Sequence, residues 1–297
     1  MSVKLGSTTT YNGYKGDTKL ENVYLGTRLI VSYSSAWKID LANYYNTTDF
    51  GLGPNVVVAG MHFTPTGENL ILHLAAVDNH LLISCNLLTP WDVSTFEDPT
   101  SWFYVTESNS NQGVFSSDGT KFYEVYYSAG AYCKQWNLST AWDITTMVEA
   151  TTLLTSIAGQ AGAVVLKNDG TSIYFFNVSS GIVYQYDMST AYDLSTATYA
   201  NKSFDYSVYA EYVYGAYMSP DNNKIFINSY FDSTVYGFNL STPGDISTAV
   251  YYRQKDMSSD LDGEFSSCLA FNPNGKKLYV LTQYDEGVLI YGYVIPE

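Results

Sequence analysis

Two kinds of side chain in this sequence could carry chemistry, acidic and aromatic. Paired carboxylates about 5–10 Å apart serve as the catalytic acid and its partner in glycosidases. Four aspartates in loop-like stretches are candidates for such a pair, namely Asp78, Asp232, Asp262 and Asp285. Their spacing along the chain fixes no distance between them. The carboxylates therefore leave a glycan-cleaving enzyme open as a hypothesis without identifying a catalytic pair.

Other catalytic and metal-binding chemistries find no support in residue spacing. The histidines, at positions 62, 73 and 80, form neither His-x-x-x-His nor His-Glu-x-x-His. The cysteines, at positions 85, 133 and 268, predict neither a disulfide framework nor a zinc motif. The stretch Asp260-Leu-Asp262-Gly263-Glu264 lacks the complete frame of a calcium loop. We therefore predict no catalytic residue, no metal and no cofactor, and that the chain is not an enzyme.

The aromatic residues recur in a repeated phrase. Each copy has Trp, Tyr or Gly before Asp, an apolar residue and two hydroxyl residues, with the aspartates at positions 92, 143, 193 and 245. A second phrase, a turn of the Asp-Gly type between apolar runs, has its turn residues at positions 67, 119, 170, 222 and 275. Both phrases repeat at intervals of 50–53 residues. A fixed period of this size indicates stacked or radially arranged units.

The unit from 110 to 158 predicts how each repeat folds. Gly accepts positive φ, so the Asp118-Gly119 pair predicts a hairpin turn between strands at 112–116 and 121–127. Further strands are expected at 131–137 and 147–154, and no helical period interrupts them. Hydrophobic residues make up 46% of the chain and 29 residues are tyrosine, a composition that suits pleated sheets. The repeat therefore predicts an all-β fold, a β-propeller with four-stranded antiparallel blades.

Five turns of the Asp-Gly type predict five blades. The last repeat supplies strands at 266–271, 277–282 and 287–293 and then stops, so an N-terminal strand must complete it. We expect that strand at 42–50, after a loop at 35–39 that resembles the repeated phrase. Residues 28–32 also resemble a third blade strand, so six blades, with a degenerate one built from residues 1–50, are the alternative.

The N-terminal residues are predicted to form a unit separate from this ring. Two short copies of one pattern, Val3-Lys4-Leu5-Gly6 and Val23-Tyr24-Leu25-Gly26, stand twenty residues apart. We predict a small β-module over residues 1–33 and the propeller over residues 34–297. A leader with a single ordered strand is the competing interpretation.

The loops of a propeller emerge on two faces, and internal comparison separates them. The repeated phrases belong to the loops between the first and second and between the third and fourth strands of each blade. The remaining loops differ from blade to blade, so they are free to build one ligand site. The candidate binding residues on this variable face are Asp78, His80, Tyr127, Tyr209, Tyr212, Tyr230, Asp232, Tyr284 and Asp285.

The repeated aromatic residues offer an alternative site. Each could stack a sugar in its own pocket, and the residues concerned are Trp37, Trp91, Trp142 and Tyr192. The competing interpretation is structural: the rings pack the loop against the next blade, and the aspartate caps the turn through backbone N–H groups. Gly244 and Lys38 break the aromatic pattern and favour the structural interpretation.

The charge of the chain excludes some partners. With 14 basic and 29 acidic residues, the net charge is −15. Phosphate backbones and anionic membranes are repelled by such a surface, so we expect no nucleic-acid partner. The sequence shows no apolar run long enough for a secretory signal or a membrane span, so we expect no membrane insertion.

The stretch 169–197 resembles a known type of repeat. Asp-Gly-Thr followed by Tyr-x-Tyr-Asp and Ser-Thr-Ala-Tyr-Asp-Leu-Ser-Thr-Ala is similar to propeller repeats of virion proteins in tailed bacteriophages. Lys4-Leu-Gly-Ser-Thr and Asn22-Val-Tyr-Leu-Gly-Thr resemble the short β-modules that precede such repeats. The resemblance covers nearly the whole chain and offers no catalytic motif.

The resemblance implies a role in the virus particle. Ring-shaped heads of this type serve as tail, fibre or capsid-surface components. We therefore expect a virion protein, made in the host cytoplasm, whose N-terminal module contacts other virion proteins. Its propeller would bind a protein or the host surface, with a lectin-like carbohydrate-binding head as the alternative.

Overall fold

The computed structural model describes strands within residues 3–39 and most of residues 57–294. The N-terminal strands are β1 (Val3–Leu5), β2 (Thr9–Tyr11), β3 (Asn22–Leu25), β4 (Arg28–Ser32) and β5 (Lys38–Ile39). From residue 57 the described chain is continuous except at 76–79, 98, 106–109, 128–129, 156–158, 262–264, 285–286 and the last three residues.

Five four-stranded antiparallel sheets form the body of the molecule. Blade 1 contains β6 (Val57–Phe63), β7 (Asn69–Ala75), β8 (His80–Asn86) and β9 (Ser101–Val105). Blade 2 contains β10 (Ser110–Phe115), β11 (Lys121–Tyr127), β12 (Ala131–Leu138) and β13 (Met147–Leu154). Blade 3 contains β14 (Ala161–Leu166), β15 (Ser172–Asn177), β16 (Ile182–Met188) and β17 (Ala197–Asp205).

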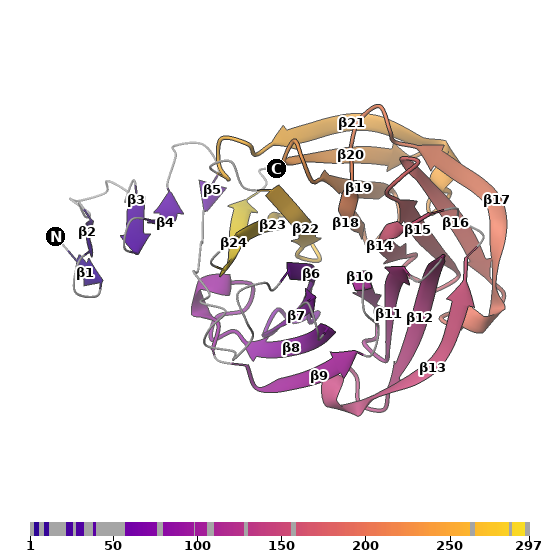
Figure 1. Ribbon diagram of the computed structural model, residues 1–297, viewed down its shortest axis with the longest axis horizontal. Coiled ribbons are helices and arrows are strands. Elements are labelled where there is room, and N and C mark those ends of the chain that lie inside the picture. Colours follow the sequence, from indigo (N-terminus) through magenta and orange to yellow (C-terminus); the bar gives the residue numbers. More distant parts are fainter. Residues whose placement is uncertain are drawn as a thin grey trace.

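The last two blades follow the same order. Blade 4 contains β18 (Val213–Met218), β19 (Lys224–Ser229), β20 (Thr234–Leu240) and β21 (Ala249–Asp256). Blade 5 contains β22 (Phe265–Phe271), β23 (Lys277–Tyr284) and β24 (Gly287–Val294), and its fourth strand is β5. The blades stand around a central axis with the first strand of each innermost (Figure 1). The all-β, five-bladed propeller predicted from the sequence is confirmed.

The N-terminal strand that closes the ring is displaced from its predicted position. Ile39 and Lys38 pair with Gly292 and Tyr293 of β24, within the segment 35–39 that the sequence predicts to be a loop. The strand predicted at 42–50 falls outside the described residues. Pairing with β5 covers the edge of β24, which could otherwise pair with another chain.

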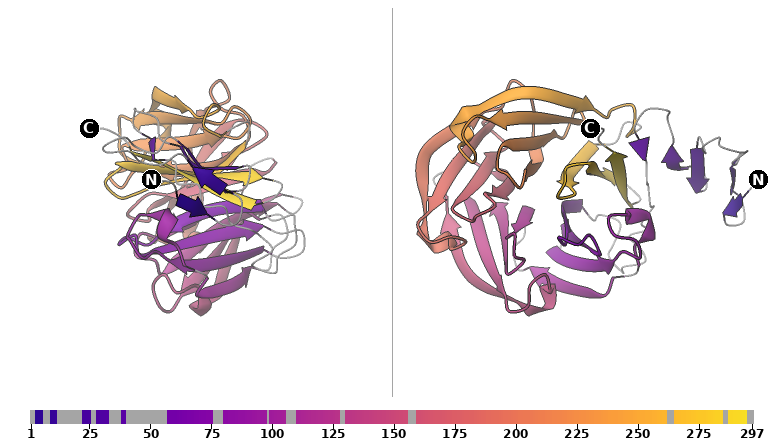
Figure 2. Two further views of the ribbon diagram at one scale, coloured as in Figure 1. Left: turned by 90° about the vertical axis from the view of Figure 1, so that its left-hand side faces the viewer. Right: turned by 180° about the vertical axis from the view of Figure 1, so that it is seen from behind.

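The alternative of six blades is wrong. The described strands before β5 form two separate hairpins, β1 with β2 and β3 with β4, and not a sixth four-stranded sheet. Residues 28–32 form a strand, but they pair with 22–25. Both hairpins lie outside the ring (Figures 1 and 2). The boundary that we place at residue 33 remains a prediction.

The Asp-Gly type of turn connects the first two strands of every blade, as predicted. Its glycines at 67, 119, 170 and 275 have φ of 67–74°, and Asn222 takes the same left-handed conformation in blade 4. Only Gly and Asn adopt this conformation at little cost. The turn residue is therefore determined by backbone geometry and needs no functional explanation.

The repeated aromatic phrase also has a structural role. Trp142 has φ of 64°, and its N–H donates to the Gly119 carbonyl at 2.9 Å, which ties the loop to the turn of its own blade. The Asp143 carboxylate accepts the Thr145 N–H at 3.0 Å and caps a short 3₁₀ helix, Ile144–Thr146. Gly244, which stands where the other copies have an aromatic residue, takes the same left-handed conformation, with φ of 73°.

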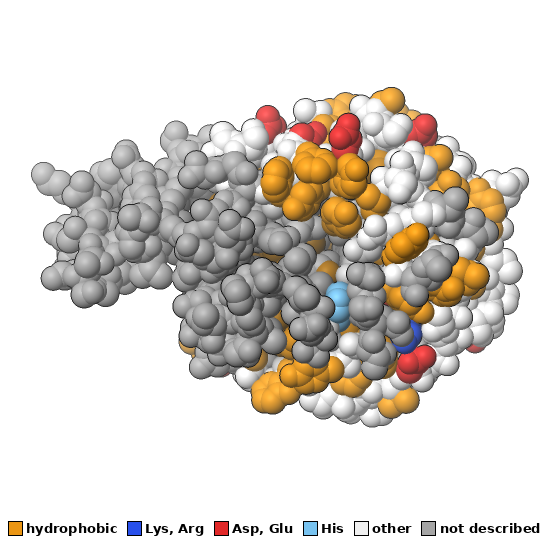
Figure 3. All heavy atoms as spheres, viewed as in Figure 1, with side chains coloured by type: hydrophobic (Ala, Val, Ile, Leu, Met, Phe, Trp, Pro, Cys, Tyr) orange, Lys and Arg blue, Asp and Glu red, His pale blue; other side chains and the backbone are white. Residues whose placement is uncertain are grey.

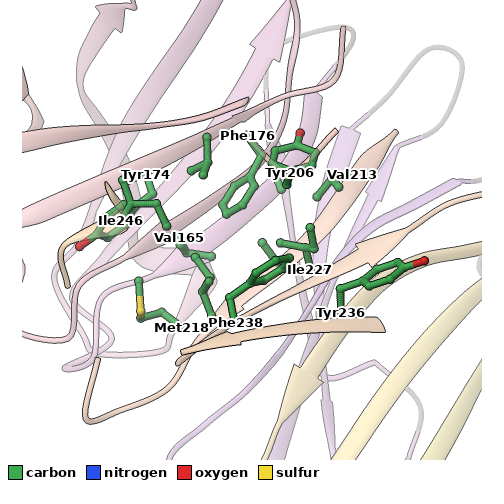
Figure 4. Packing of buried hydrophobic residues seen from close by; sticks show 14 of the residues in the cluster. Val165, Tyr174, Phe176, Tyr206, Val213, Met218, Ile227, Tyr236, Phe238 and Ile246 are labelled. Atoms are coloured by element: carbon green, nitrogen blue, oxygen red, sulfur yellow. The ribbon is translucent and has the colours of Figure 1, made fainter. Parts of the chain in front are cut away.

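Neighbouring blades are joined through a tyrosine of the second strand. The Tyr123 hydroxyl donates to the Tyr192 carbonyl of blade 3 at 2.6 Å, and the Tyr279 hydroxyl of blade 5 donates to the Trp91 carbonyl of blade 1 at 2.6 Å. The sequence predicts that the repeated aromatic loop contacts a neighbouring blade. The backbone carbonyl of the aromatic residue makes this contact. Between the sheets, apolar side chains such as Val165, Phe176 and Phe238 interdigitate (Figure 4).

Replacing Tyr123 by phenylalanine tests this junction. The Tyr192 carbonyl would lose the hydroxyl of Tyr123, so the change should cost about 1–2 kcal/mol of unfolding free energy. Urea denaturation measures the loss. Tyr199→Phe is the matched control because Tyr199 is 40% exposed on the outer strand β17 and should change stability little. Equal midpoints for both variants would contradict the role of the junction.

Candidate functional site

A depression of about 360 Å³ opens at the centre of the variable face. It lies where the innermost strands begin, so four blades contribute to its wall. This depression, the aromatic hollow, is lined by Val58, Ala59, Ser110, Asn111, Gln112, Tyr212, Tyr214, Tyr230, Phe231 and Ser267. Hydrophobic side chains gather beside the centre of the ring, between β18, β19 and β22 (Figure 3).

One side of the hollow is a continuous aromatic cluster from blade 4. The Tyr212 and Phe231 rings stand edge to face at 5.0 Å, and those of Tyr214 and Tyr230 do so at 5.6 Å. Phe265 of blade 5 stacks on Tyr230 with centroids 4.9 Å apart. Tyr212, Phe231 and Phe265 are 46%, 52% and 41% exposed. Large aromatic rings left open together in this way are typical of binding surfaces.

Local backbone geometry presents these rings. The Glu211 N–H donates to the Ser229 hydroxyl at 3.2 Å, and the Tyr230 N–H donates to the Glu211 carbonyl at 3.2 Å. These bonds tie the loop before β18 to the end of β19. Tyr212 then turns into β18 with φ of 52°, a conformation that non-glycine residues adopt rarely. The loop and the strand end are thereby locked side by side.

The floor of the hollow is a glutamine amide that crosses the channel. Gln112 of β10 donates from Nε2 to the Ala216 carbonyl and accepts at Oε1 from the Ala216 N–H, both at 3.1 Å. The side chain thus bridges blades 2 and 4. Gln112 also lines a second depression, on the opposite face. Its amide therefore stands between the two mouths of the channel.

A buried polar cluster adjoins Ser110, one of the lining residues. The Ser110 hydroxyl donates to Glu124 at 3.0 Å and lies 3.4 Å from His73 Nε2, while the Trp136 indole N–H donates to Glu124 at 2.9 Å. Ser, His and Glu are the residue types of a catalytic triad, but the same His73 nitrogen faces both Ser110 and Glu124. A triad needs the acid on the other ring nitrogen. The cluster is therefore not a triad, and its hydrogen bonds hold Ser110 in the wall of the hollow.

Burial keeps the histidines of this region neutral. It lowers the pKa of His62 to about 4 and is the main cause that lowers the pKa of His73 to about 3. No partner satisfies His62 Nε2 or His73 Nδ1 among the described residues. Charging His62 would place an unpaired charge in the core, whereas His73 Nε2 lies 3.9 Å from the Glu124 carboxylate.

The second depression, of about 340 Å³, opens on the repeated-loop face. Trp91 and Trp142 line it together, and each ring lies against the turn glycine of its own blade and a neighbouring phenylalanine. The Tyr192 hydroxyl lies 2.8 Å from that of Ser117. The three described aromatic residues therefore pack on the turns, and two of them share one depression.

The predicted variable-face residues divide between the hollow and other places. Tyr212 and Tyr230 line the hollow. Tyr209 stacks on Tyr251 at 5.1 Å, and the Asp232 carboxylate accepts from the Tyr236 hydroxyl at 2.9 Å.

His80 is buried, and Tyr127 is exposed at the end of β11. Asp78, Asp285 and Trp37, and the side chain of Tyr284, lie outside what is described.

The sequence-based list missed Tyr214, Phe231, Phe265 and Gln112. These residues lie at or next to the ends of blade strands that border the variable loops. The signal that could have found them is their position relative to the repeat: each stands where an innermost strand begins or a second strand ends.

In the described part of the chain, no three or more His, Cys, Asp or Glu side chains come together as a metal site would require. No helix there is long and apolar enough to cross a bilayer.

Solved structures with a similar fold were compared with the chain. The luciferin-regenerating enzyme aligns over 86% of this chain and 95% of its own, with 15% identity and a TM-score of 0.51. A chain of the mitotic checkpoint complex aligns over 93% and 84%, with 11% identity and a TM-score of 0.50. A candidate 6-phosphogluconolactonase of Bacteroides uniformis aligns over 80% and 68%, with 14% identity and a TM-score of 0.49. No family model and no curated protein sequence matches the chain.

The first of these structures contradicts the prediction that the chain is not an enzyme. An enzyme has the same fold over most of both chains. The prediction rested on the absence of a contiguous catalytic motif, but a propeller can assemble its site from loops far apart in sequence, so that absence has little weight. At these identities the likeness establishes the fold alone: the chain is a five-bladed β-propeller.

Proposed function

We propose that the protein is a virion-associated propeller of a bacteriophage that binds the host surface through the aromatic hollow. The observation that carries the binding role is the cluster of aromatic rings at the channel mouth, three of them 41–52% exposed. Apolar side chains gathered in the open cost free energy in water, and this cost is offset when a ligand covers them.

The assignment to a virion is supported by the repeat phrases and by the N-terminal hairpins. The repeats resemble those of tailed-phage virion proteins, and β1–β4 lie outside the ring, where they could contact a neighbour (Figure 2). We propose that residues 1–33 join the propeller to other virion proteins. The net charge of −15 argues against a nucleic-acid partner.

Virion composition and host adsorption test the proposal. Mass spectrometry of purified particles should detect the protein, and its absence would refute the virion assignment. Particles that carry Phe231→Ala should adsorb to host cells at least about tenfold more slowly, because the variant removes an exposed ring from the cluster. Release of sugars from host-surface glycans by the purified chain would instead support the glycan-cleaving hypothesis.

A further inference from the structure

The lining of the aromatic hollow is electrically neutral in its described part. Its side chains are aromatic, aliphatic, hydroxyl or amide, and none is acidic or basic. Glu211 and Asp232 stand next to Tyr212 and Phe231 in the chain, but neither lines the hollow, and Glu124, which accepts from the Ser110 hydroxyl, is fully buried. A ligand with a phosphate, sulfate or carboxylate group would lose its hydration there without gaining a counter-charge. The hollow therefore favours an uncharged ligand.

The aromatic rings form a corner that suits a small saturated ring. Phe231 is nearly perpendicular to both Tyr212 and Phe265, at 82° and 89°. A pyranose ring has apolar C–H faces and hydroxyl groups around its rim, so it can pack a face against one aromatic ring while its rim meets another. An aliphatic chain would use the same surface but would leave the polar groups of the hollow without partners.

Those polar groups lie around the same corner. The hydroxyls of Tyr212 and Tyr214 have no hydrogen-bond partner among the described residues. The Asn111 amide donates one N–H to the Ala161 carbonyl at 2.8 Å, which leaves its oxygen able to accept. Such a mixture of hydroxyl donors and amide acceptors matches the hydroxyl groups of a sugar.

The Gln112 amide closes the inner end of the hollow. Both of its polar atoms bond to Ala216 across the channel, so a polymer cannot pass from one face to the other without breaking this pair. The volume, about 360 Å³, is at the small end of ligand sites, and only the end of a chain fits.

We infer that the aromatic hollow binds the terminal unit of an uncharged saccharide. This inference rests on the proposed binding role of the hollow and names the class of ligand. The Tyr212 and Phe231 rings hold the sugar face, the free hydroxyls and the Asn111 amide bind its rim, and the Gln112 amide limits entry to one terminal unit.

A glycan array tests the inference with the full-length chain. The array carries neutral oligosaccharides ending in glucose, galactose, mannose or N-acetylglucosamine, their sialylated and sulfated counterparts, and neutral chains whose terminal ring bears a bulky cap. Binding is expected to the uncapped neutral glycans only. Equal binding to acidic or capped glycans, or no binding to any glycan, would overturn the inference.

A matched pair of variants assigns the binding to the hollow. Tyr212→Phe removes one hydroxyl and keeps the ring, and should weaken neutral-glycan binding about tenfold. Tyr104→Phe, on β9 outside the hollow, should bind as the unchanged protein does. Equal binding by both variants would contradict the site.

The outcomes also separate this inference from the proposed function. If Phe231→Ala particles lose host adsorption while no glycan binds, the surface-binding role holds and a protein receptor replaces the sugar. If neutral glycans bind but purified virions lack the protein, the ligand class holds and the virion assignment fails.

Discussion

Replacing Gly119 by alanine should destabilise the protein by about 2–4 kcal/mol, the largest effect we expect from a single methyl group. Two costs add at this residue. Its φ of 70° is unfavourable for any residue with a Cβ, which costs about 1 kcal/mol. A Cβ would also lie 2.1 Å from Trp142 Nε1, so the ring must leave its place on the turn, an overpacking cost of about 1–3 kcal/mol.

Gly275→Ala is the matched control for this prediction. Gly275 occupies the same turn in blade 5 with φ of 67°, but nothing lies within 4 Å of a Cβ built there. Gly275→Ala should lower the unfolding free energy only by the cost of the positive φ, about 1 kcal/mol. Urea unfolding of both variants measures the difference. Equal losses would show that the Trp142 ring contributes nothing to the turn.

Acidification should destabilise the fold between pH 6.5 and pH 4. The pKa of His62 falls from 6.5 to about 4, and that of His73 to about 3, mainly because both rings are buried. The unfolded chain therefore binds protons on these rings at a pH where the folded chain does not. This stability is fully present above pH 6.5 and is lost as the pH falls toward the folded-state pKa values. Each ring accounts for about 2 kcal/mol at pH 4.5.

The measurement is unfolding free energy at pH 7.5 and pH 4.5. His62→Met removes one of the two rings, so its loss over this interval should be smaller than that of the unchanged protein by about 2 kcal/mol. Asp193→Asn is the control, because hydrogen bonds from Ser195 lower the pKa of Asp193, which therefore titrates below this interval. An unchanged pH dependence in His62→Met would contradict the prediction.

Much of the fold could be predicted because the same pattern of strands and turns recurs in every repeat. The strands of blade 2, predicted at 112–116, 121–127, 131–137 and 147–154, agree with β10–β13 to within two residues at each end. The turn glycine and the capping aspartate recur because the blades share a turn with positive φ and a short 3₁₀ helix that needs a cap. Closure of the ring was harder to locate, since a two-residue strand such as β5 carries almost no alternation to recognise.

The site could be predicted only in part, because it depends on contacts between blades. Internal comparison pointed to the variable face, and Tyr212 and Tyr230 lie in its hollow. The floor was not visible in the sequence: Gln112 and Ala216 are 104 residues apart and belong to different blades, so the fold must be known before they can be paired. Asp232 was proposed from its loop position, but its carboxylate bonds to the Tyr236 hydroxyl of its own blade.

Binding of the purified chain to host cells tests the central claim most directly. Phe231 and Trp102 are both exposed aromatic residues, at 52% and 60%, but only Phe231 lines the hollow. We expect Phe231→Ala to reduce cell binding at least about tenfold and Trp102→Ala to leave it unchanged. Equal binding by the two variants, or a loss confined to Trp102→Ala, would contradict the assignment of the hollow as the binding site.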